Sequence, residues 1–492
     1  MAGWRLINDR NFASFARSRP ASHDAAHTIG PVAWAVGLCK MAGKGRHGGG
    51  TEALPEETEG VSMKGMIKVA LAASTSVVAL AGMVGSAAAS GFINSSQSSV
   101  FNGMAYAGAA APGSTSAATM FMNPATMTSF KRITFDTNYT FGVPTTKITG
   151  AYTGASPLNG LLNARPLSGD VGLDYFVPAT YFIYPFNDRV FFGVSLNTTY
   201  GNSTKADPLS RTSFLASTTK LRITTLTPSI AYKVNDMWSF GVGLQIQYAS
   251  ARQVVPLPPA GAAGAGITQA DGWGVGVTAG LTFTPTKTTQ IGLGWRSLID
   301  QSIEGTTVLG AGSSSNSKGT LNLPNRVNLS LRQTLHPKVD LLASVEWQNW
   351  GRLGHAALKN PAPGFPAVLP FGYSDGWFFS LGSEYRYNDK LTLRAGIGYE
   401  ISAVTDSVRR ASLPDNDRLW LSTGFTYEVS DRFSVNASYS YLHIKKAPIT
   451  QALAAGSTFV GESKADAHLI SFGLTSRWGA PPKREDVLVK KF

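Results

Sequence analysis

Few residues of this chain have the types and spacing that catalysis requires. A hydrolase needs a nucleophile with a base in reach, yet the histidines beyond residue 90 are dispersed at positions 336, 355, 443 and 468, and neither a Gly-x-Ser-x-Gly nor a His-Glu-x-x-His motif occurs. The single cysteine, Cys39, precedes a segment that we expect to be removed on export, which excludes a thiol nucleophile, disulfides and a Cys-ligated zinc site. Gly-rich stretches such as 272–280 alternate like strands and do not resemble a phosphate loop. A non-enzyme without a cofactor is therefore expected.

Charged residues with suggestive spacing stand on alternate positions of two neighbouring segments. Glu384 and Arg386 share one polar row, and Arg394 and Glu400 share the polar row of the next segment. In a membrane β-barrel such rows face the lumen, where charged side chains are common. The spacing predicts lumen ion pairs with a structural role.

The elements that must position these charges follow from an alternation of apolar and polar residues. From Phe433 to Tyr441 every second residue is apolar and the residues between are Ser or Asn, which is the period of a β-strand. Three further rows, Trp238 to Tyr248, Trp273 to Phe283 and Trp377 to Tyr387, carry aromatic residues at one or both ends and mainly aliphatic residues between. Because aromatic side chains favour the membrane interfaces and aliphatic ones the hydrocarbon, these rows indicate lipid-facing surfaces.

About fourteen candidate strands follow Lys131, an even number as a closed bacterial barrel requires. They are expected at residues 131–143, 175–187, 189–200, 218–234, 236–250, 270–285, 287–304, 320–335, 338–352, 374–388, 390–403, 416–429, 431–446 and 465–478. Tight polar turns join several pairs, whereas the alternate connections, such as 144–174, 201–217 and 447–464, are long and rich in Gly, Ala, Pro and Ser. Short turns on one rim and long loops on the other are typical of outer-membrane barrels. The predicted fold is all-β, a transmembrane antiparallel barrel.

Composition agrees with this fold class. Charged residues make up only 15% of the 492 residues and the mean hydropathy is −0.01, as expected when half of each strand is apolar and half polar. The formal charge of +13 is scattered over the chain, without a run of Lys and Arg interleaved with aromatic residues. No nucleic-acid partner is therefore expected.

The first 130 residues divide into three parts. Residues 1–62 show no sustained periodicity, and we expect a disordered extension or an upstream start that is not used. Residues 63–89 have a basic start, an apolar run and small residues at their end, which predicts a cleaved secretory signal peptide. Residues 90–130 are small, polar and Gly/Ala-rich; placed in the lumen as a plug, or hatch, they would hide their backbone polar groups against the polar rows.

Three blocks carry a family resemblance. The start of the exported chain together with Asn123-Pro124-Ala125 resembles an N-terminal hatch and its Asn-Pro-Ala motif. The segment LNLPNRV at 321–327 resembles a Leu-Asn-Leu-Pro strand start, and LPDNDRLWLSTGFTYEV at 413–429 is similar to a Pro-Asp-x-Asp-Arg-x-Trp-Leu-Ser block. On these residues the chain resembles the bacterial outer-membrane long-chain fatty acid and hydrophobic compound transporters (FadL type, OMPP1/FadL/TodX) over essentially the whole of residues 90–478.

This resemblance implies a mechanism of uptake. A hydrophobic ligand would be captured at the extracellular loops, would pass to a pocket beside the hatch, and would leave sideways through a gap at a kink in the third strand. On this interpretation Gly201 corresponds to the kink glycine. The candidate pocket residues are Phe92, Phe101, Met104, Phe121 and Arg252. The barrel would span 131–478, followed by a tail at 479–492 after the aromatic Trp478.

The ligand stays open between two classes. The family's pocket arginine aligns with Val255, near Arg252, and its pocket lysine falls where this chain reads PFGYSDG, so a carboxylate partner is not matched residue by residue. Fatty acids are the first expectation, and neutral hydrophobes such as aromatic hydrocarbons are the alternative. A general porin would lack a hatch. The expected partners are a hydrophobic small molecule and outer-membrane lipid, and the expected state is a monomer.

Overall fold

The computed structural model describes residues 91–479, apart from residues 168, 216, 257–264, 310–312, 360–367 and 454–455. The predicted extension, the signal peptide, Ser90 and the tail beyond residue 479 lie outside the described residues. Within the described ranges, none of the helices is long and apolar enough to cross a membrane.

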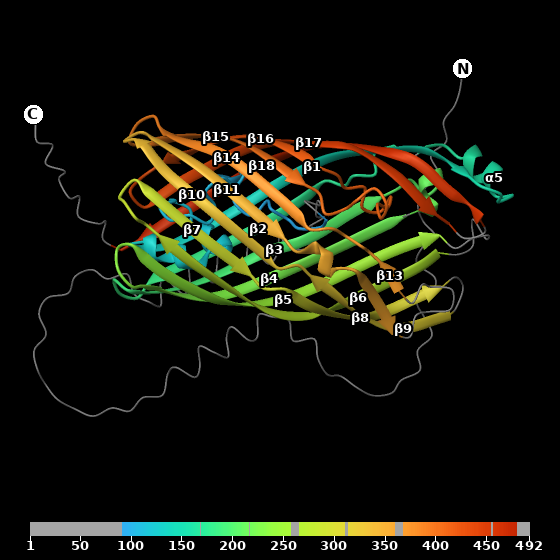
Figure 1. Ribbon diagram of the computed structural model, residues 1–492, viewed down its shortest axis with the longest axis horizontal. Helices are drawn as coiled ribbons and strands as arrows, with labels where there is room; N and C mark the ends of the chain where they lie inside the picture. The colour runs from blue at the N-terminus through green and yellow to red at the C-terminus, as the bar shows by residue number, and fades with distance from the viewer. Residues whose placement is uncertain are drawn as a thin grey trace, which may run out of the picture. The chain divides into compact units, whose positions relative to one another are not determined.

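The described part of the chain contains fourteen antiparallel wall strands that close into a barrel, because the first, β1 (Ile133–Thr153), pairs with both β2 (Tyr175–Pro185) and the last, β18 (Thr458–Trp478). Figure 1 shows the barrel from the side. The wall between β2 and β18 consists of β3 (Val190–Lys205), β4 (Thr218–Lys233), β5 (Trp238–Pro256), β6 (Ala265–Phe283), β7 (Thr289–Arg296), β10 (Arg326–His336), β11 (Val339–Gln348), β14 (Gly376–Arg386), β15 (Leu391–Ile401), β16 (Arg418–Glu428) and β17 (Phe433–Ala452). This closure confirms the predicted fold class.

The remaining elements belong to the long-loop connections. β8 (Ile299–Leu309) continues β7 and pairs with β6, and β9 (Ser313–Leu323) leads into β10 and pairs with β8. β12 (His355–Lys359) and β13 (Val368–Pro370) lie between β11 and β14 in sequence. Three short helices are also found in connections: α5 (Asn159–Ala164), η3 (Arg211–Phe214) and η4 (Trp350–Arg352).

Side chains alternate between the two faces of the wall as the sequence predicts. Along β5, Phe240, Val242 and Leu244 are exposed on the outside, and their inward neighbours Gln245 and Gln247 are buried. The same alternation runs through β6, β14 and β16. An apolar surface around the whole barrel is stable only against lipid, because such a patch is far larger than water-soluble monomers expose.

Several strands are longer than the alternation predicts. The connections expected at 144–174 and 447–464 instead begin or end in strand, because β1 and β18 stay in register up to the pair Thr153–Thr458. The extra residues are mostly small or polar, and so lack the apolar row by which a lipid-facing strand is recognised. Their backbone groups still pair, because a ladder needs no particular side chain.

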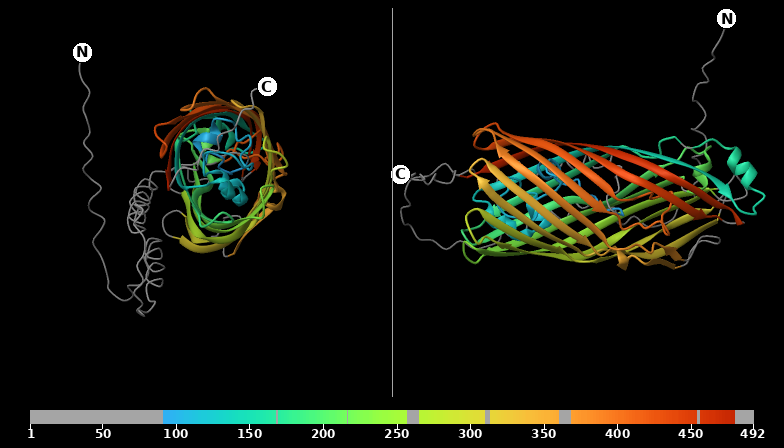
Figure 2. Two further views of the ribbon diagram at one scale, coloured as in Figure 1. Left: turned by 90° about the vertical axis from the view of Figure 1, so that its left-hand side faces the viewer. Right: turned by 45° about the horizontal axis from the view of Figure 1, so that its top comes forward.

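The lumen holds residues 91–130, drawn in blue inside the ring of strands in Figure 2. This segment, here called the lumen segment, contains α3 (Ser99–Asn102), α4 (Thr119–Met122) and η2 (Pro124–Ser129). Its backbone bonds to polar side chains of the wall: the amide of Gly108 donates to Ser344 Oγ at 2.8 Å, and the amide of Ala110 donates to Ser330 Oγ at 3.0 Å. The polar inner rows thus satisfy backbone groups that no helix or strand satisfies.

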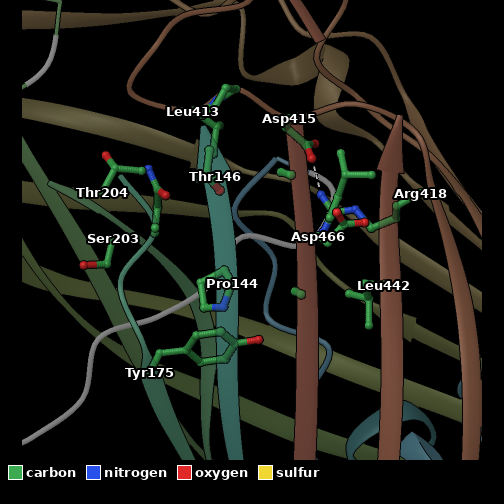
Figure 3. A pocket seen from close by; sticks show the side chains of 16 residues that line it. Pro144, Thr146, Tyr175, Ser203, Thr204, Leu413, Asp415, Arg418, Leu442 and Asp466 are labelled. Atoms are coloured by element: carbon green, nitrogen blue, oxygen red, sulfur yellow. Dashed lines mark hydrogen bonds and ion pairs between the residues drawn. The ribbon is translucent and has the colours of Figure 1, made fainter. Parts of the chain in front are cut away.

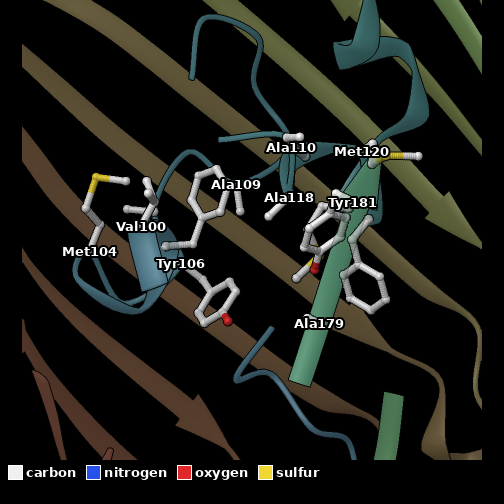
Figure 4. Packing of buried hydrophobic residues seen from close by; sticks show 14 of the residues in the cluster. Val100, Met104, Tyr106, Ala109, Ala110, Ala118, Met120, Ala179 and Tyr181 are labelled. Atoms are coloured by element: carbon white, nitrogen blue, oxygen red, sulfur yellow. The ribbon is translucent and has the colours of Figure 1, made fainter. Parts of the chain in front are cut away.

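An apolar core forms between the lumen segment and β2. Val100, Met104 and Tyr106 pack near Ala109 and Ala118, and Tyr181 of β2 approaches them from the wall (Figure 4). Two non-glycine residues, Ala105 and Tyr106, have positive φ angles of 47° and 62°, a conformation that L-residues rarely adopt. A tight local turn therefore brings the Tyr106 ring into this core.

Candidate functional site

The hydrogen-bonded ladder between β2 and β3 stops part of the way along the wall. The final pair in register is Ala179 with Asn197, so the first four residues of β2 pair with β1 but have no described partner on β3. β3 then carries a register shift between Thr198 and Tyr200. A bulge of this kind bends a strand and increases its twist. The wall therefore has a gap in its pairing, and Gly201 lies directly beyond the bulge.

The start of the described chain fills this gap. Ile93 forms an antiparallel bridge with Tyr200. The amide of Gly201 donates to the carbonyl of Phe92 at 2.8 Å. On the other side of the bridge, the amide of Asn94 donates to the carbonyl of Thr199 at 2.9 Å. Residues 92–94 thus run along the edge of β3 that β2 leaves open. We refer to them as the gap strand.

Gln97 joins both sides of the gap. Its side-chain amide donates to the carbonyl of Thr198 at 2.5 Å, and its Oε1 accepts from Asn197 Nδ2 at 3.0 Å. From β2, the hydroxyl of Tyr181 donates to the Gln97 carbonyl at 2.9 Å. The backbone amide of Gln97 in turn donates to the hydroxyl of Tyr106 at 2.7 Å. Burial raises the pKa of this Tyr106 hydroxyl. A neutral network therefore closes the wall where its own ladder ends.

An apolar cluster lies on the lumen side of the gap strand. The ring of Phe92 meets the ring of Trp350 edge-on at 4.7 Å and that of Tyr200 at 6.1 Å. The full set, here called the aromatic cluster, is Phe92, Ile93, Tyr200, Ile223, Ala249, Ile299, Leu321, Leu323, Trp350, Leu353, Tyr373, Ala403, Val404 and Leu413. Phe92 reaches this cluster from the gap strand, so its packing depends on the position of the gap strand.

Two arginines face each other inside the lumen, from β7 and β10. Arg326 pairs with Glu346 at 2.7 Å, whereas no ion pair between described residues involves Arg296. Arg296 lies 4.3 Å from the ring of Phe121, donates to the Phe121 carbonyl at 2.9 Å, and leaves its Nη2 without a hydrogen-bond partner in the described chain. Both arginines are buried. Two arginines and one glutamate thus give one excess positive formal charge in a buried site. We refer to Arg296 and Arg326 as the arginine pair.

Hydrogen bonds connect the arginine pair to the aromatic cluster. Trp350 Nε1 donates to Gln348 Oε1 at 3.1 Å, and Gln348 Nε2 donates to the Glu346 carboxylate at 2.8 Å. In sequence, the arginines lie three residues from the cluster members Ile299 and Leu323. A buried cation without a full partner is destabilising, so an anion that reached Nη2 of Arg296 would be stabilised there.

A small cavity of about 90 Å³ lies beside the gap. Figure 3 shows Tyr175 at the start of β2 among its lining residues, and Ser203 and Thr204 of β3 across the cavity from Arg418 of β16. Arg418 contacts the carboxylates of Asp415 and Glu400. The cavity therefore reaches the open edge of the wall, and its cation is already balanced by acids.

The other end of the lumen segment fits closely against β5 and β6. Asn123 Oδ1 accepts from the amide of Ala125 at 3.0 Å and so caps η2, while its Nδ2 donates to the carbonyl of Leu281 at 2.9 Å. A Cβ placed on Gly280 would lie 1.8 Å from Asn123 Oδ1, and one on Gly241 would lie 2.5 Å from the Ala125 amide. Only glycine permits this approach, so the Asn-Pro-Ala turn packs directly against the backbone of β5 and β6.

The structure separates the proposed pocket residues. Phe92 belongs to the aromatic cluster, whereas Phe101, Met104 and Phe121 pack in the core between the lumen segment and the wall. Arg252 does not face the lumen at all: it follows Tyr248 on the outward row of β5 and lines a hollow on the outside of the barrel. The alignment that placed it near the pocket could not fix its face, because a shift of one residue moves a strand side chain to the other side of a sheet.

The four predicted lumen charges do face inward, and they form a wider network than their own two strands. Glu384 and Arg394 meet at 2.7 Å, as the neighbouring rows suggested. Arg386 pairs with Asp340 of β11 at 2.8 Å. Glu400 pairs with Arg418 of β16 at 3.4 Å. Within the described residues, no group of three or more His, Cys, Asp or Glu side chains is arranged to hold a metal.

The arginine pair and Gln97 were not identified from the sequence. Arg296 and Arg326 do lie at inward positions of the strand alternation, so a systematic list of inward charges without a neighbouring acid would have found Arg296. Gln97 offered no such signal, because it lies in an irregular segment and its partners in the barrel wall are 84 to 101 residues away.

Comparisons with known proteins agree on one family. The family model described as "Outer membrane protein transport protein (OMPP1/FadL/TodX)" matches residues 80–478. A long-chain fatty acid transport protein of Escherichia coli O6:H1 is 29% identical over 386 residues, which cover 70% of this chain and 85% of that protein. Outer membrane protein P1 of Haemophilus influenzae is 28% identical over 388 residues, covering 70% and 84%.

Solved structures share the fold. A FadL homologue of Pseudomonas aeruginosa superposes with a TM-score of 0.71 at 21% identity, covering 79% of this chain and 100% of that one. The toluene transporter TbuX of Ralstonia pickettii gives a TM-score of 0.57 at 18% identity, covering 78% and 100%. At these identities the likeness concerns the barrel architecture.

Proposed function

The chain belongs to the outer membrane protein transport family (OMPP1/FadL/TodX), and from this premise we propose that it takes up hydrophobic small molecules passively, with long-chain fatty acids as its substrate class. Members of the family are outer-membrane transport proteins and not enzymes. The observation that carries the proposal is the gap between β2 and β3, which is closed by the gap strand and Gln97 instead of by the wall itself.

Capture would begin at the long loops. Leu161, Leu167 and Leu209 are 66%, 45% and 72% exposed, although they are large apolar side chains. They lie in the connections β1–β2 and β3–β4, which also contribute Leu162, Val171 and Leu215 to a separate apolar cluster. An apolar solute gains about 0.8 kcal/mol for each CH₂ that it buries, so this surface can hold an alkyl chain before it enters the lumen.

Passage would follow from competition for the aromatic cluster. A ligand that inserts there takes the place of Phe92, and displacing Phe92 pulls the gap strand from β3. Ten buried CH₂ groups contribute about 8 kcal/mol. The two backbone hydrogen bonds of the gap strand and the two side-chain hydrogen bonds between Gln97 and β3 contribute roughly 2–6 kcal/mol together. The ligand can therefore open the gap, move past Gly201 and leave sideways into the membrane.

The arginine pair supports fatty acids as the substrate class. A carboxylate that reaches Arg296 would gain a charge-assisted hydrogen bond from the Nη2 that has no described partner. Its alkyl chain would then lie against the aromatic cluster, to which the pair is joined through Gln348 and Trp350. Phe121 covers Arg296, so the lumen segment must shift before this contact can form.

A specific observation favours neutral hydrophobes as the second candidate. The cavity beside the gap contains one arginine, Arg418, which already contacts Asp415 and Glu400. A ligand that used this cavity alone would find no excess positive charge. An aromatic hydrocarbon suits such a site better than a carboxylate does.

Uptake of radiolabelled oleate and of toluene by cells with and without the protein tests the function. We expect faster oleate uptake with the protein, and no effect on either compound would contradict transport. Arg296→Met should lower oleate uptake about tenfold, because one charge-assisted hydrogen bond is worth about 1.5–3 kcal/mol, and should leave toluene uptake within about twofold. Arg432→Met, in an exposed short turn, is the matched control.

A further inference from the structure

The outer face of the barrel carries a hollow of about 640 Å³ over β4, β5 and β6. Three basic residues, Lys220, Arg222 and Arg252, line it together with a single carboxylate, that of Asp271. The basic residues that line the hollow therefore outnumber its carboxylates by two. Its basic residues lie on the outward side of the wall, whereas the arginine pair lies in the lumen; Asn202 and Ser203 border both this hollow and the cavity beside the gap.

The strand alternation places these residues outside. On β5, Tyr248, Ser250 and Arg252 continue the row of Phe240, Val242 and Leu244, which are exposed toward lipid. On β4, Lys220 and Arg222 continue the row of exposed Leu226 and Ile230 in the same way. The register between β4 and β5 contains no bulge along this stretch, so the side chains of these rows stay on the outer face of the wall.

Two of the cations stand directly opposite each other. Lys220 pairs in register with Arg252 across β4 and β5, and like charges at such positions destabilise a sheet. No ion pair between described residues involves either of them. The Asp271 carboxylate, one row nearer the membrane centre, accepts a hydrogen bond from Tyr248 at 3.1 Å. An anion between Lys220 and Arg252 would turn this repulsion into attraction.

The height of the hollow identifies the source of the anion. Tyr248 borders its lower edge, and the Tyr248 ring lies 5.0 Å from that of Trp273 in a tilted arrangement. Aromatic girdles mark the level where hydrocarbon meets headgroups. Lys220 is at the start of β4 and Arg252 near the end of β5, on the rim opposite the short turn that joins these strands. Long loops face the cell exterior, so the hollow lies at the headgroup level of the outer leaflet.

We propose that this hollow binds a phosphate group of an anionic outer-leaflet glycolipid of the lipid A type. Arginine matches two phosphate oxygens through its planar fork, and lysine adds a point charge. The lipid's acyl chains would then run down the wall over Trp273 and Val275, which are exposed on the same row. A soluble anion would gain the charge contacts without the apolar ones. The bound lipid would cover the outside of β4 next to the bulged part of β3, since Ser203 also borders the hollow.

The test uses the purified full barrel in detergent and measures binding of lipid A by native mass spectrometry. Lys220→Gln/Arg252→Gln should weaken binding at least tenfold, because each basic residue near an anionic headgroup contributes about 1 kcal/mol. The matched control is Lys147→Gln/Lys464→Gln: these lysines also face each other across two strands, β1 and β18, but Lys464 lies 3.7 Å from Glu462. The control should bind lipid A as the parent protein does.

Two further measurements decide the source of the anion. Lipid A stripped of its phosphates should bind the parent protein as weakly as lipid A binds the double variant. Inorganic phosphate at millimolar concentration should not displace lipid A; full displacement would overturn the lipid proposal in favour of a soluble-anion site. Equal lipid A binding by the parent and the double variant would overturn the site itself. Oleate uptake and the heat-modifiable migration of the folded barrel in gels check that both variants are intact.

Discussion

The two ends of the lumen segment are held by different physical means. The gap strand at 92–94 and Gln97 are held by hydrogen bonds along an open strand edge. The Asn-Pro-Ala end is held by shape, because Gly241 and Gly280 leave room for its backbone and for Asn123. Hydrogen bonds can be exchanged for bonds to water or to another strand, whereas a seated backbone cannot leave without opening a void.

This difference assigns a role to each end. In the proposed mechanism the shape-held end stays in place while the other end moves, so that a ligand would open the gap without emptying the lumen. A barrel whose plug were held equally at both ends would either remain closed or lose its plug. Four changes test this comparison, beginning with the removal of both ends.

Deletion of residues 91–125 should have the largest effect. The wall strands pair with each other around the whole barrel, so we expect a folded barrel with an open polar lumen. Conductance in planar bilayers should rise by at least about tenfold, because a lumen of this size without a plug passes ions. If the deleted protein folds and stays as poorly conducting as the parent, the lumen segment does not block the pore.

A disulfide across the gap should abolish most of the uptake. Ile93 and Tyr200 are bridge partners, and directly opposite residues of antiparallel strands lie within the distance that a disulfide spans. Ile93→Cys/Tyr200→Cys should take up oleate about tenfold more slowly when oxidised and should recover on reduction. Each single cysteine variant controls for the lost side chain. Undiminished uptake by the oxidised protein would show that the gap strand need not leave β3.

The sequence predicts the wall better than it predicts the site. Strand alternation is a local signal, so rows such as Phe433 to Tyr441 reveal their facing without knowledge of any neighbour. The interruption of the β2–β3 ladder leaves no comparable signal, because it depends on a partner from residues 92–94 about a hundred positions away. Gly201 could be proposed at the kink only through the family resemblance.

The incorrect and missing predictions have the same origin. Arg252 was placed near the pocket by an alignment in a region where each single-residue shift changes the face of the sheet. Arg296 is not evident from the sequence because its significance lies in a missing acid. Its neighbour Arg326 pairs with Glu346, whereas among the described residues Arg296 contacts the ring and carbonyl of Phe121 and forms no ion pair. Pairing across strands is a tertiary property that alternation does not encode.

Gly280→Ala tests the shape-held end and should have a smaller effect. Its new Cβ would lie 1.8 Å from Asn123 Oδ1, so Asn123 must move and lose its bond to the Leu281 carbonyl. We expect a destabilisation of about 1–3 kcal/mol, measured as a lower midpoint of thermal unfolding. Gly160→Ala is the control, since a Cβ there would meet nothing within 4 Å. An unchanged midpoint would mean that the turn is not seated as tightly as its contacts indicate.

Gln97→Ala should have the smallest effect. Unlike the disulfide, it should make oleate uptake faster. The change removes the side-chain bonds to Thr198 and Asn197 but leaves the gap strand and the Asn-Pro-Ala turn in place. Because only the closed state loses these bonds, opening becomes easier, and oleate uptake should rise about two- to fivefold for a net loss of roughly 0.5–1 kcal/mol. Gln333→Ala, whose side chain accepts from Thr289 far from the gap, should leave uptake unchanged. Slower uptake by Gln97→Ala would mean that Gln97 supports the open state, and the hydrogen-bonded end would then be more than a closure that the ligand displaces.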